Sequence, residues 1–280
     1  MAHDPGRPVT RVVCQQLDPP VGDPAQCRAL ALEACAAAGA LGADVCVLPE
    51  LVTSGYVFAS GDEAAAAALR ADAPELAAWG RALGRPGGVV VGGFCERGSD
   101  GHLYDSAAVV GAGGVLAVYR KLHLWDREQL VFAAGGAPPP VVATPAGRIA
   151  PLVCYDLEFP ELVRSVALRG AELLAVPTSW PLVERPAGER PPEVLAAMVG
   201  ARTNRVAIAC CDRRGVERGQ AFTAGTAIVD EQGWVVAEAG SATTACADLD
   251  LSRSRDKAIG PRNDAFADRR PEHYVGLLDR

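Results

Sequence analysis

The sequence IAPLVCYDLEFPE, residues 149–161, indicates how this chain folds. Its apolar run ends at Cys154, acidic residues follow, and residues 162–168 carry apolar side chains at helical spacing. We interpret this pattern as a buried strand that delivers a cysteine to a sharp turn before a helix. A thiol at such an elbow is a candidate nucleophile, because amides at the start of a helix favour its thiolate. Free cysteine is also among the most buried residue types, so Cys154 alone does not predict catalysis.

Composition narrows the class of protein. The chain has 280 residues, 49% of them hydrophobic and 22% charged, which predicts a soluble globular protein with a substantial core. The formal net charge of −7 argues against nucleic acid or an anionic membrane as the main partner. Apolar stretches are interrupted before membrane-spanning length, and the N-terminus lacks a secretory pattern. We therefore expect a cytoplasmic protein with no membrane or nucleic-acid partner.

The cysteines and histidines do not form a pattern typical of metal binding. Nine cysteines are an odd number, and several lie in apolar runs, so we expect them to be reduced and mostly structural: Cys14, Cys46, Cys210 and Cys246. CxxC, HxH and HExxH are absent, and so are GxGxxG and the P-loop. The sequence therefore predicts neither a metal site nor a bound cofactor.

Apolar strands alternate with helices along the chain. The strands near residues 45, 89, 150 and 173 are apolar throughout, which predicts that both faces of each strand are covered. Helices predicted over residues 24–38, 74–83 and 193–203 are interleaved with the predicted strands, as is typical of an α/β fold. Hairpins about residues 111–113 and 230–233 predict mixed sheets. Without a linker or an internal repeat, a single domain over residues 1–280 is expected.

Three of the apolar strands are followed by reactive side chains, namely Glu50, Lys121 and Cys154. In layered α/β folds, ligand sites form where strands reach their carboxyl ends. A carboxylate, an amine and a thiol in one pocket could carry out acyl transfer: the thiol attacks, the carboxylate moves its proton and the ammonium stabilises the oxyanion. Each residue alone has an ordinary explanation as a solvated charge or a core cysteine, so the combination carries the hypothesis.

The surroundings of these residues resemble the nitrilase superfamily of carbon–nitrogen hydrolases. The resemblance covers nearly the whole chain and keeps the family's order and spacing. It rests on the segments Leu48-Pro49-Glu50-Leu51, Tyr119-Arg120-Lys121-Leu122-His123, Cys154-Tyr155-Asp156, Phe159-Pro160-Glu161 and Pro177-Thr178-Ser179-Trp180. It implies a four-layer αββα sandwich with a core over residues 8–252. It also implies a homodimer or higher homo-oligomer, with the tail 253–280 at a subunit contact.

The resemblance also implies a role for each reactive residue. Glu50 would be the general base, and Cys154 would form a thioester with the acyl group. Lys121 would stabilise the tetrahedral intermediate together with the backbone amide of Tyr155. Glu128 matches a second family glutamate that positions the lysine and the substrate amide. An amidase that hydrolyses a small linear carboxamide to a carboxylate and ammonia is the expected activity.

The substrate pocket is less well defined by the sequence. We expect Tyr56, Ser179 and Trp180 to line it, together with Glu158. The acidic residues that follow Cys154 suggest a substrate with a cationic end, such as an ω-amino or ω-guanidino amide. Internal ion pairs explain Asp156 and Glu158 equally well.

Other functions remain open at this point. A nitrilase or an N-carbamoyl amidohydrolase would use the same three residues and the same thioester. A Cys–His thiol hydrolase would need an imidazole beside Cys154, and His123 is the one candidate. An inactive scaffold subunit of the same fold is the non-enzymatic alternative.

Overall fold

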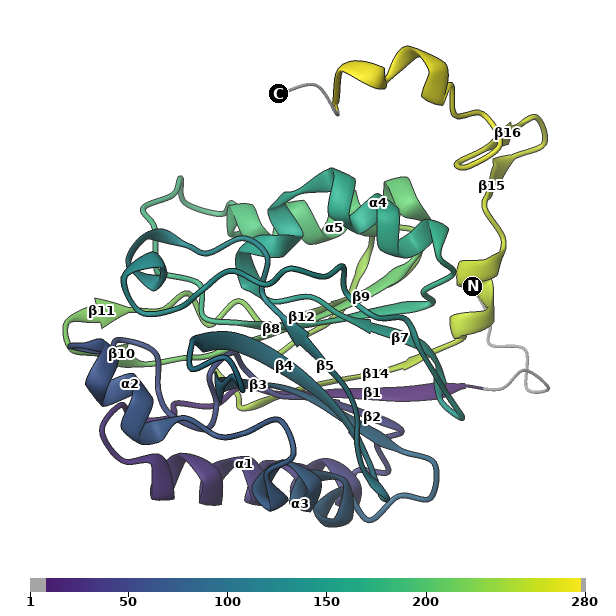
Figure 1. Ribbon diagram of the computed structural model, residues 1–280. Helices are drawn as coiled ribbons and strands as arrows, with labels where there is room; N and C mark the ends of the chain where they lie inside the picture. Colours follow the sequence, from purple (N-terminus) through teal and green to yellow (C-terminus); the bar gives the residue numbers. More distant parts are fainter. Residues whose placement is uncertain (1–8, 278–280) are drawn as a thin grey trace.

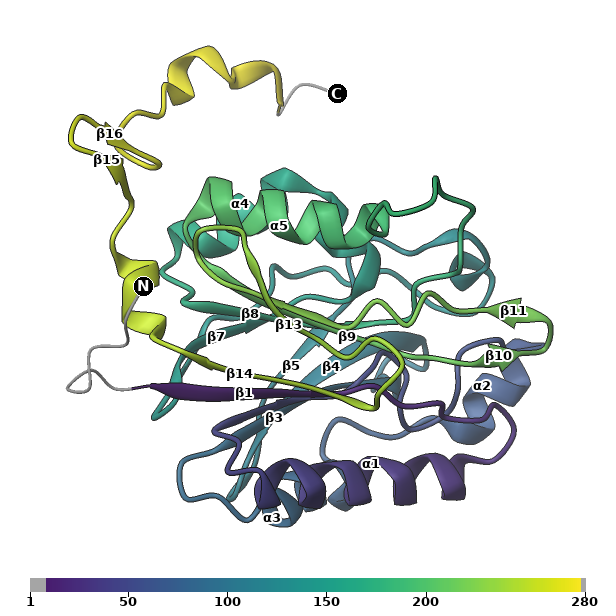
Figure 2. The same ribbon diagram turned by 180° about the vertical axis from the view of Figure 1, so that it is seen from behind.

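Two six-stranded sheets stack face to face between two layers of helices (Figures 1 and 2). The structure is a computed structural model that describes residues 9–277. The layer order is helix, sheet, sheet, helix, which confirms the predicted αββα sandwich of the α/β class. Residues 1–8 and 278–280 of the predicted domain and its tail lie outside the described residues.

The first sheet has the strand order β14-β1-β2-β3-β4-β5. Strands β1, β2 and β3 run parallel, whereas β14, β4 and β5 pair antiparallel with their neighbours. Two successive antiparallel pairings make β5 run in the same direction as β2. The bounds are β1 Thr10–Gln15, β2 Val45–Val47, β3 Val89–Arg97, β4 Leu103–Gly111, β5 Gly114–Arg120 and β14 Thr244–Leu249.

The second sheet has the strand order β13-β12-β9-β8-β7-β6. The parallel strands β7, β8 and β9 lie in the middle, as their uninterrupted apolar sequences predicted. Antiparallel hairpins complete the two edges. The bounds are β6 Val142–Thr144, β7 Gly147–Pro151, β8 Leu173–Thr178, β9 Ala207–Asp212, β12 Ala227–Val229 and β13 Val235–Glu238.

Each sheet is buried on both faces. Small and β-branched side chains from both sheets, such as Val12, Val91 and Ile149, fill the space between them. The outer face of the first sheet packs against α1 (Pro24–Ala40) and α3 (Pro74–Leu83). That of the second sheet packs against α4 (Pro160–Leu168) and α5 (Pro192–Asn204). This double coverage explains why the middle residues of the central strands are apolar.

Several local features differ from the sequence-based expectations. The alanine-rich segment Gly61–Ala67 forms a short helix, α2, whose first turn is capped by the Ser60 hydroxyl. A small hairpin, β10 (Val216–Glu217) with β11 (Gln220–Ala221), was also not predicted. Cys246 was expected inside the protein but is exposed, because it lies on the outward side of β14, next to the buried Ala245.

The C-terminal segment leaves the sandwich after the short helix η3 (Leu251–Arg255) and extends beyond the layer that holds α4 and α5 (Figure 1). It contains only short elements: β15 Ala258–Gly260, β16 Asn263–Asp264, η4 Pro271–His273 and η5 Val275–Leu277. None of the helices between residues 9 and 277 has both the length and the apolar character needed to cross a membrane.

Candidate active site

The three reactive residues converge because their strands end at the interface between the sheets. Glu50 follows β2 and Lys121 follows β5, and these two strands run in the same direction within the first sheet. Cys154 follows β7 of the facing sheet. Gly93 on β3 lies against Glu50, where an added Cβ would come within 2.5 Å of the Glu50 Cα. Glycine is therefore required there for the turn that carries Glu50 to approach the sheet.

The ammonium group of Lys121 is at the centre of the site and is fully buried. Its Nζ donates to Glu50 Oε1 at 2.7 Å and to the two carboxylate oxygens of Glu128 at 2.7 and 2.8 Å. Asp105 Oδ2 lies 3.4 Å from the same nitrogen. Burial alone would lower the pKa of Lys121, but the carboxylates of Glu128 and Glu50 raise it well above its usual value. The amine is therefore charged.

Glu128 is held in place by three different donors. It lies on the short helix η1 (Asp126–Leu130) and is 5% exposed. Besides Lys121, it accepts hydrogen bonds from the Tyr56 hydroxyl at 2.6 Å and from the backbone amide of Trp125 at 2.8 Å. Burial raises the pKa of Glu128, and the Lys121 ammonium opposes that effect. Two residues predicted from the sequence, Glu128 and Tyr56, are thus joined directly to the lysine.

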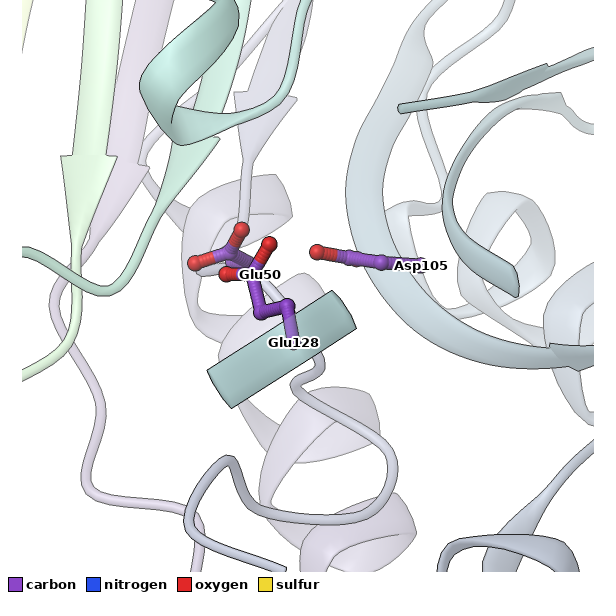
Figure 3. Close-up of side chains that lie close together, drawn as sticks. All are labelled: Glu50, Asp105 and Glu128. Carbon is purple, nitrogen blue, oxygen red and sulfur yellow. The ribbon is translucent and has the colours of Figure 1, made fainter. Parts of the chain in front are cut away.

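Asp105 on β4 belongs to the same cluster, and the sequence analysis missed it. The carboxylate oxygens of Glu50, Asp105 and Glu128 come within 4.8 Å of one another, and Figure 3 shows the three side chains pointing toward a common region. Among residues 9–277 this is the one group of His, Cys, Asp or Glu side chains spaced to share a cation, and the Lys121 ammonium supplies that charge. The available signal was a carboxylate inside a largely apolar strand.

Cys154 occupies a strained elbow beside this cluster. Its φ is +47°, in the left-handed region, and it begins the short helix η2 (Cys154–Glu158). Burial and the negative charge of Glu50 raise the pKa of the thiol well above its usual value, although Lys121 and a hydrogen bond from the Ser179 backbone act in the opposite direction. The resting thiol therefore keeps its proton and requires a base. Glu50 Oε2 has no hydrogen-bond partner in the described structure and is free to accept a proton.

Asp156 and His123 are bound to each other rather than to the lysine cluster. Asp156 Oδ1 accepts from the backbone amide of His123 at 3.1 Å and lies 2.7 Å from its Nδ1. Asp156 Oδ2 accepts from the Tyr119 hydroxyl at 2.7 Å and from the Val153 amide at 3.2 Å. The His123 ring stacks on Phe159 with centroids 3.6 Å apart. Internal contacts thus explain Asp156, one of the two explanations that the sequence left open.

The remaining predicted pocket residues lie at different depths. Trp180 and Ser179 are buried, and Trp180 belongs to the same apolar cluster as Cys154. Tyr155 is half-buried, and its ring makes edge contacts with Trp125. Glu158 is exposed at the end of η2, outside the lysine cluster, and partial burial together with Glu193 raises its pKa.

A hollow of about 330 Å³ adjoins the lysine cluster. It shares Tyr56 and Glu128 with the cluster, and aromatic rings form much of its wall. The other lining residues include Phe58, Trp125, Phe132 and Gln220.

Glu217 on β10 holds the loop that carries Tyr56. Its carboxylate accepts hydrogen bonds from the backbone amides of Val21, Tyr56 and Val57. The sequence left open whether residues 212–219 lie near the site or at a subunit contact, and the structure places Glu217 beside the site.

The site therefore combines a buried cysteine at a strand–helix elbow with a buried lysine held by carboxylates, within an αββα sandwich. The sequence model of the carbon-nitrogen hydrolase family matches residues 11–258, and the chain belongs to this family.

The relatives include both nitrilases and amidases. A nitrilase of Pyrococcus abyssi is 32% identical over 269 residues, covering 95% of this chain and 99% of the relative. A 2-oxoglutaramate amidase of Bacillus subtilis is 29% identical and covers 76% of this chain and 81% of its own. The solved structure of an amidase from Nesterenkonia sp. AN1 superposes with a TM-score of 0.80 at 28% identity, over 99% of this chain and 100% of that one. That structure carries the acetamide moiety of fluoroacetamide on its active-site cysteine. The family therefore acts on carbon–nitrogen bonds other than peptide bonds, as predicted.

Proposed function

We propose that this protein is an amidase that hydrolyses a small linear carboxamide to a carboxylate and ammonia, through a thioester on Cys154. The observation that carries the proposal is the buried ammonium of Lys121, hydrogen-bonded to Glu50 and Glu128. Cys154 lies close enough to all three for their charges to act on its thiol. Such a site combines a nucleophile, a base and a fixed positive charge.

In the first half-reaction, Glu50 takes the thiol proton and the sulfur attacks the amide carbonyl carbon. The carbonyl oxygen becomes an oxyanion that Lys121 stabilises together with the backbone amide of Tyr155. The proton held by Glu50 passes to the amide nitrogen, the carbon–nitrogen bond breaks and ammonia leaves. Glu128 keeps the lysine oriented throughout.

In the second half-reaction, Glu50 takes a proton from water, and the resulting hydroxide attacks the thioester. The carbon–sulfur bond breaks, the carboxylic acid is released, and the Cys154 sulfur regains a proton from Glu50. Because the base is restored, one carboxylate serves both halves.

A test of the proposal is a screen of short amides, with parallel nitriles and carbamoyl compounds, that measures ammonia release by the wild type and by Cys154→Ser. We expect release from amides by the wild type and a loss of at least about a thousandfold in the variant. Faster turnover of nitriles would instead support a nitrilase, and faster turnover of carbamoyl compounds an N-carbamoyl amidohydrolase. If no compound is turned over and no adduct forms on Cys154, the result would favour an inactive scaffold subunit of the same fold.

The hypothesis of a cationic substrate now depends on Glu158 and Glu193, because Asp156 is engaged internally. Glu158 is exposed and Glu193 is half-buried, and the pKa of each carboxyl group is raised. An ω-aminoalkanamide and an ω-guanidinoalkanamide should therefore be compared with butyramide of similar length. Equal or better turnover of butyramide would refute the cationic hypothesis.

We also propose that the chain forms a homodimer or higher homo-oligomer through the tail 253–280, of which residues 253–277 are described. The tail leaves the sandwich next to the helix layer (Figure 1), where α5 exposes Leu195 and Val199. Light scattering of the full chain and of a version ending at residue 255 tests this proposal. A larger assembly is expected for the full chain alone.

A further inference from the structure

Asp105 is a buried carboxylate of the site for which no hydrogen-bond donor is found. It lies within β4, opposite Cys95 of β3, and its side chain has no exposed surface. Within residues 9–277, neither of its carboxylate oxygens accepts a hydrogen bond. Leaving a buried carboxylate in this condition is costly, which suggests that the group is not an ordinary carboxylate.

The charges around Asp105 do not balance if every carboxyl group is ionised. Glu50, Asp105 and Glu128 would supply three negative charges against the single positive charge of Lys121. Among the described residues, Lys121 is the only cation that these three carboxylates contact. Cys95 faces the group as well, and burial raises the pKa of its thiol, so it stays neutral. A buried cluster with this excess of negative charge retains a proton.

The contacts indicate which carboxyl group holds that proton. Glu128 accepts from Lys121, Tyr56 and the Trp125 amide, and Glu50 accepts from Lys121 at 2.7 Å. Asp105 accepts no hydrogen bond from any residue between 9 and 277 and lies farther from the ammonium, at 3.4 Å. Burial and the charge of Glu50 both raise the pKa of Asp105 well above its usual value.

The contacts also indicate which group accepts a hydrogen bond from the protonated Asp105. The Asp105 and Glu50 carboxyl oxygens lie within 4.8 Å of each other, and a hydrogen bond between the two side chains is among the causes that raise the pKa of Asp105. Glu50 Oε2 has no other donor among the described residues. Two carboxyl oxygens can share a hydrogen bond only when one of them carries a proton.

We propose that Asp105 is a positioning residue that keeps its proton and donates it in a hydrogen bond to the Glu50 carboxylate, holding the general base in place. This role rests on the proposed function of Glu50. A donor on Glu50 stabilises its ionised form, which can accept the thiol proton of Cys154.

The first test measures the melting temperature of Asp105→Asn against pH, which needs no substrate. A carboxyl group whose pKa is raised by folding loses stability as the pH rises above its unfolded value, and asparagine does not titrate. The variant should therefore gain in melting temperature relative to wild type, and the gain should grow from about pH 5 to about pH 8. Glu96→Gln is the matched control, because Glu96 is equally buried but is paired with Arg120 and Ser106. The melting temperature of Glu96→Gln should fall below that of the wild type.

The second test compares amide hydrolysis by Asp105→Asn, Asp105→Ala and Asp105→Leu. Asparagine keeps a donor to Glu50, whereas alanine and leucine do not. We expect kcat to fall roughly ten- to a hundredfold for alanine and leucine with little change in KM, and asparagine to restore it.

Two results would overturn the proposal: a lower melting temperature of Asp105→Asn at about pH 8, or full activity of Asp105→Ala. The first would indicate an ionised Asp105. Infrared spectra add a direct test, because wild type should show the carbonyl band of a protonated carboxyl group that Asp105→Asn lacks. If wild type hydrolyses no amide, the proposed function fails, while the melting and infrared tests still decide the protonation of Asp105.

Discussion

Two fully buried aspartates lie on opposite sides of the site and differ in their hydrogen bonding. Asp156 contacts four polar groups: the backbone amide and ring Nδ1 of His123, the Tyr119 hydroxyl and the Val153 amide. Asp105 has no donor among the described residues. Their positions in the fold explain the difference. Asp156 follows the Cys154 elbow, where backbone amides are free to donate. Asp105 lies in a strand whose amides are used in the sheet. The first aspartate therefore stabilises the structure, and the second is available for the chemistry.

The largest effect is expected from replacing Lys121, the cation of the cluster that contains Asp105. Lys121→Met should reduce amide hydrolysis by at least about a thousandfold, because the oxyanion loses its charged donor. It should also lower the free energy of unfolding by roughly 3–5 kcal/mol, because the buried carboxylates of Glu50 and Glu128 lose their counter-charge. Ammonia release and urea unfolding measure the two losses.

A control for Lys121 is available in the neighbouring residue. Arg120→Ala removes an ion pair with Glu96 outside the cluster and should leave kcat within a few-fold of wild type. If Lys121→Met were no more damaging than Arg120→Ala, the lysine would not have the role assigned to it.

Asparagine at position 156 should have the opposite effect on stability from asparagine at position 105. Asp156→Asn places an NH₂ group against hydrogen-bond donors and should lower the free energy of unfolding by about 2 kcal/mol. Asp105→Asn should raise it near neutral pH. Urea unfolding of both variants at one pH gives the comparison. If the free energy of unfolding changes in the same direction in both variants, the two aspartates do not differ in the way described.

Tyr56→Phe should have a smaller effect, confined to the rate. It removes the 2.6 Å hydrogen bond to Glu128 while keeping the ring that lines the hollow. We expect kcat to fall roughly tenfold with the melting temperature little changed. An unchanged kcat would mean that Lys121 and the Trp125 amide hold Glu128 in place without the Tyr56 hydroxyl.

His123→Ala should have the smallest effect on the rate. It removes a ring that contacts Asp156 and Phe159, so a loss of stability of about 1 kcal/mol is expected. Activity should stay within about tenfold of wild type. A loss as large as that of Cys154→Ser would instead support the Cys–His scheme.

Much of the fold could be predicted because its central strands are uniformly apolar and end at Glu50, Lys121 and Cys154. The elbow was visible as an apolar run that stops at a cysteine before a helix. The features that were missed depend on contacts between distant segments. Asp105 is a single carboxylate in a strand, and its meaning appears only when Glu50 and Glu128 lie beside it. The role of Glu217 is similar, because it binds backbone amides more than 150 positions away.

The most direct test of the account is the mass of the protein after rapid acid quenching during turnover of an amide that the screen identifies. Peptide mapping should place the acyl group, which is the amide less ammonia, on the peptide that contains Cys154. Cys154→Ala should show neither the adduct nor ammonia release. Ammonia release that persists in Cys154→Ala, or an acyl group on another residue, would contradict the account.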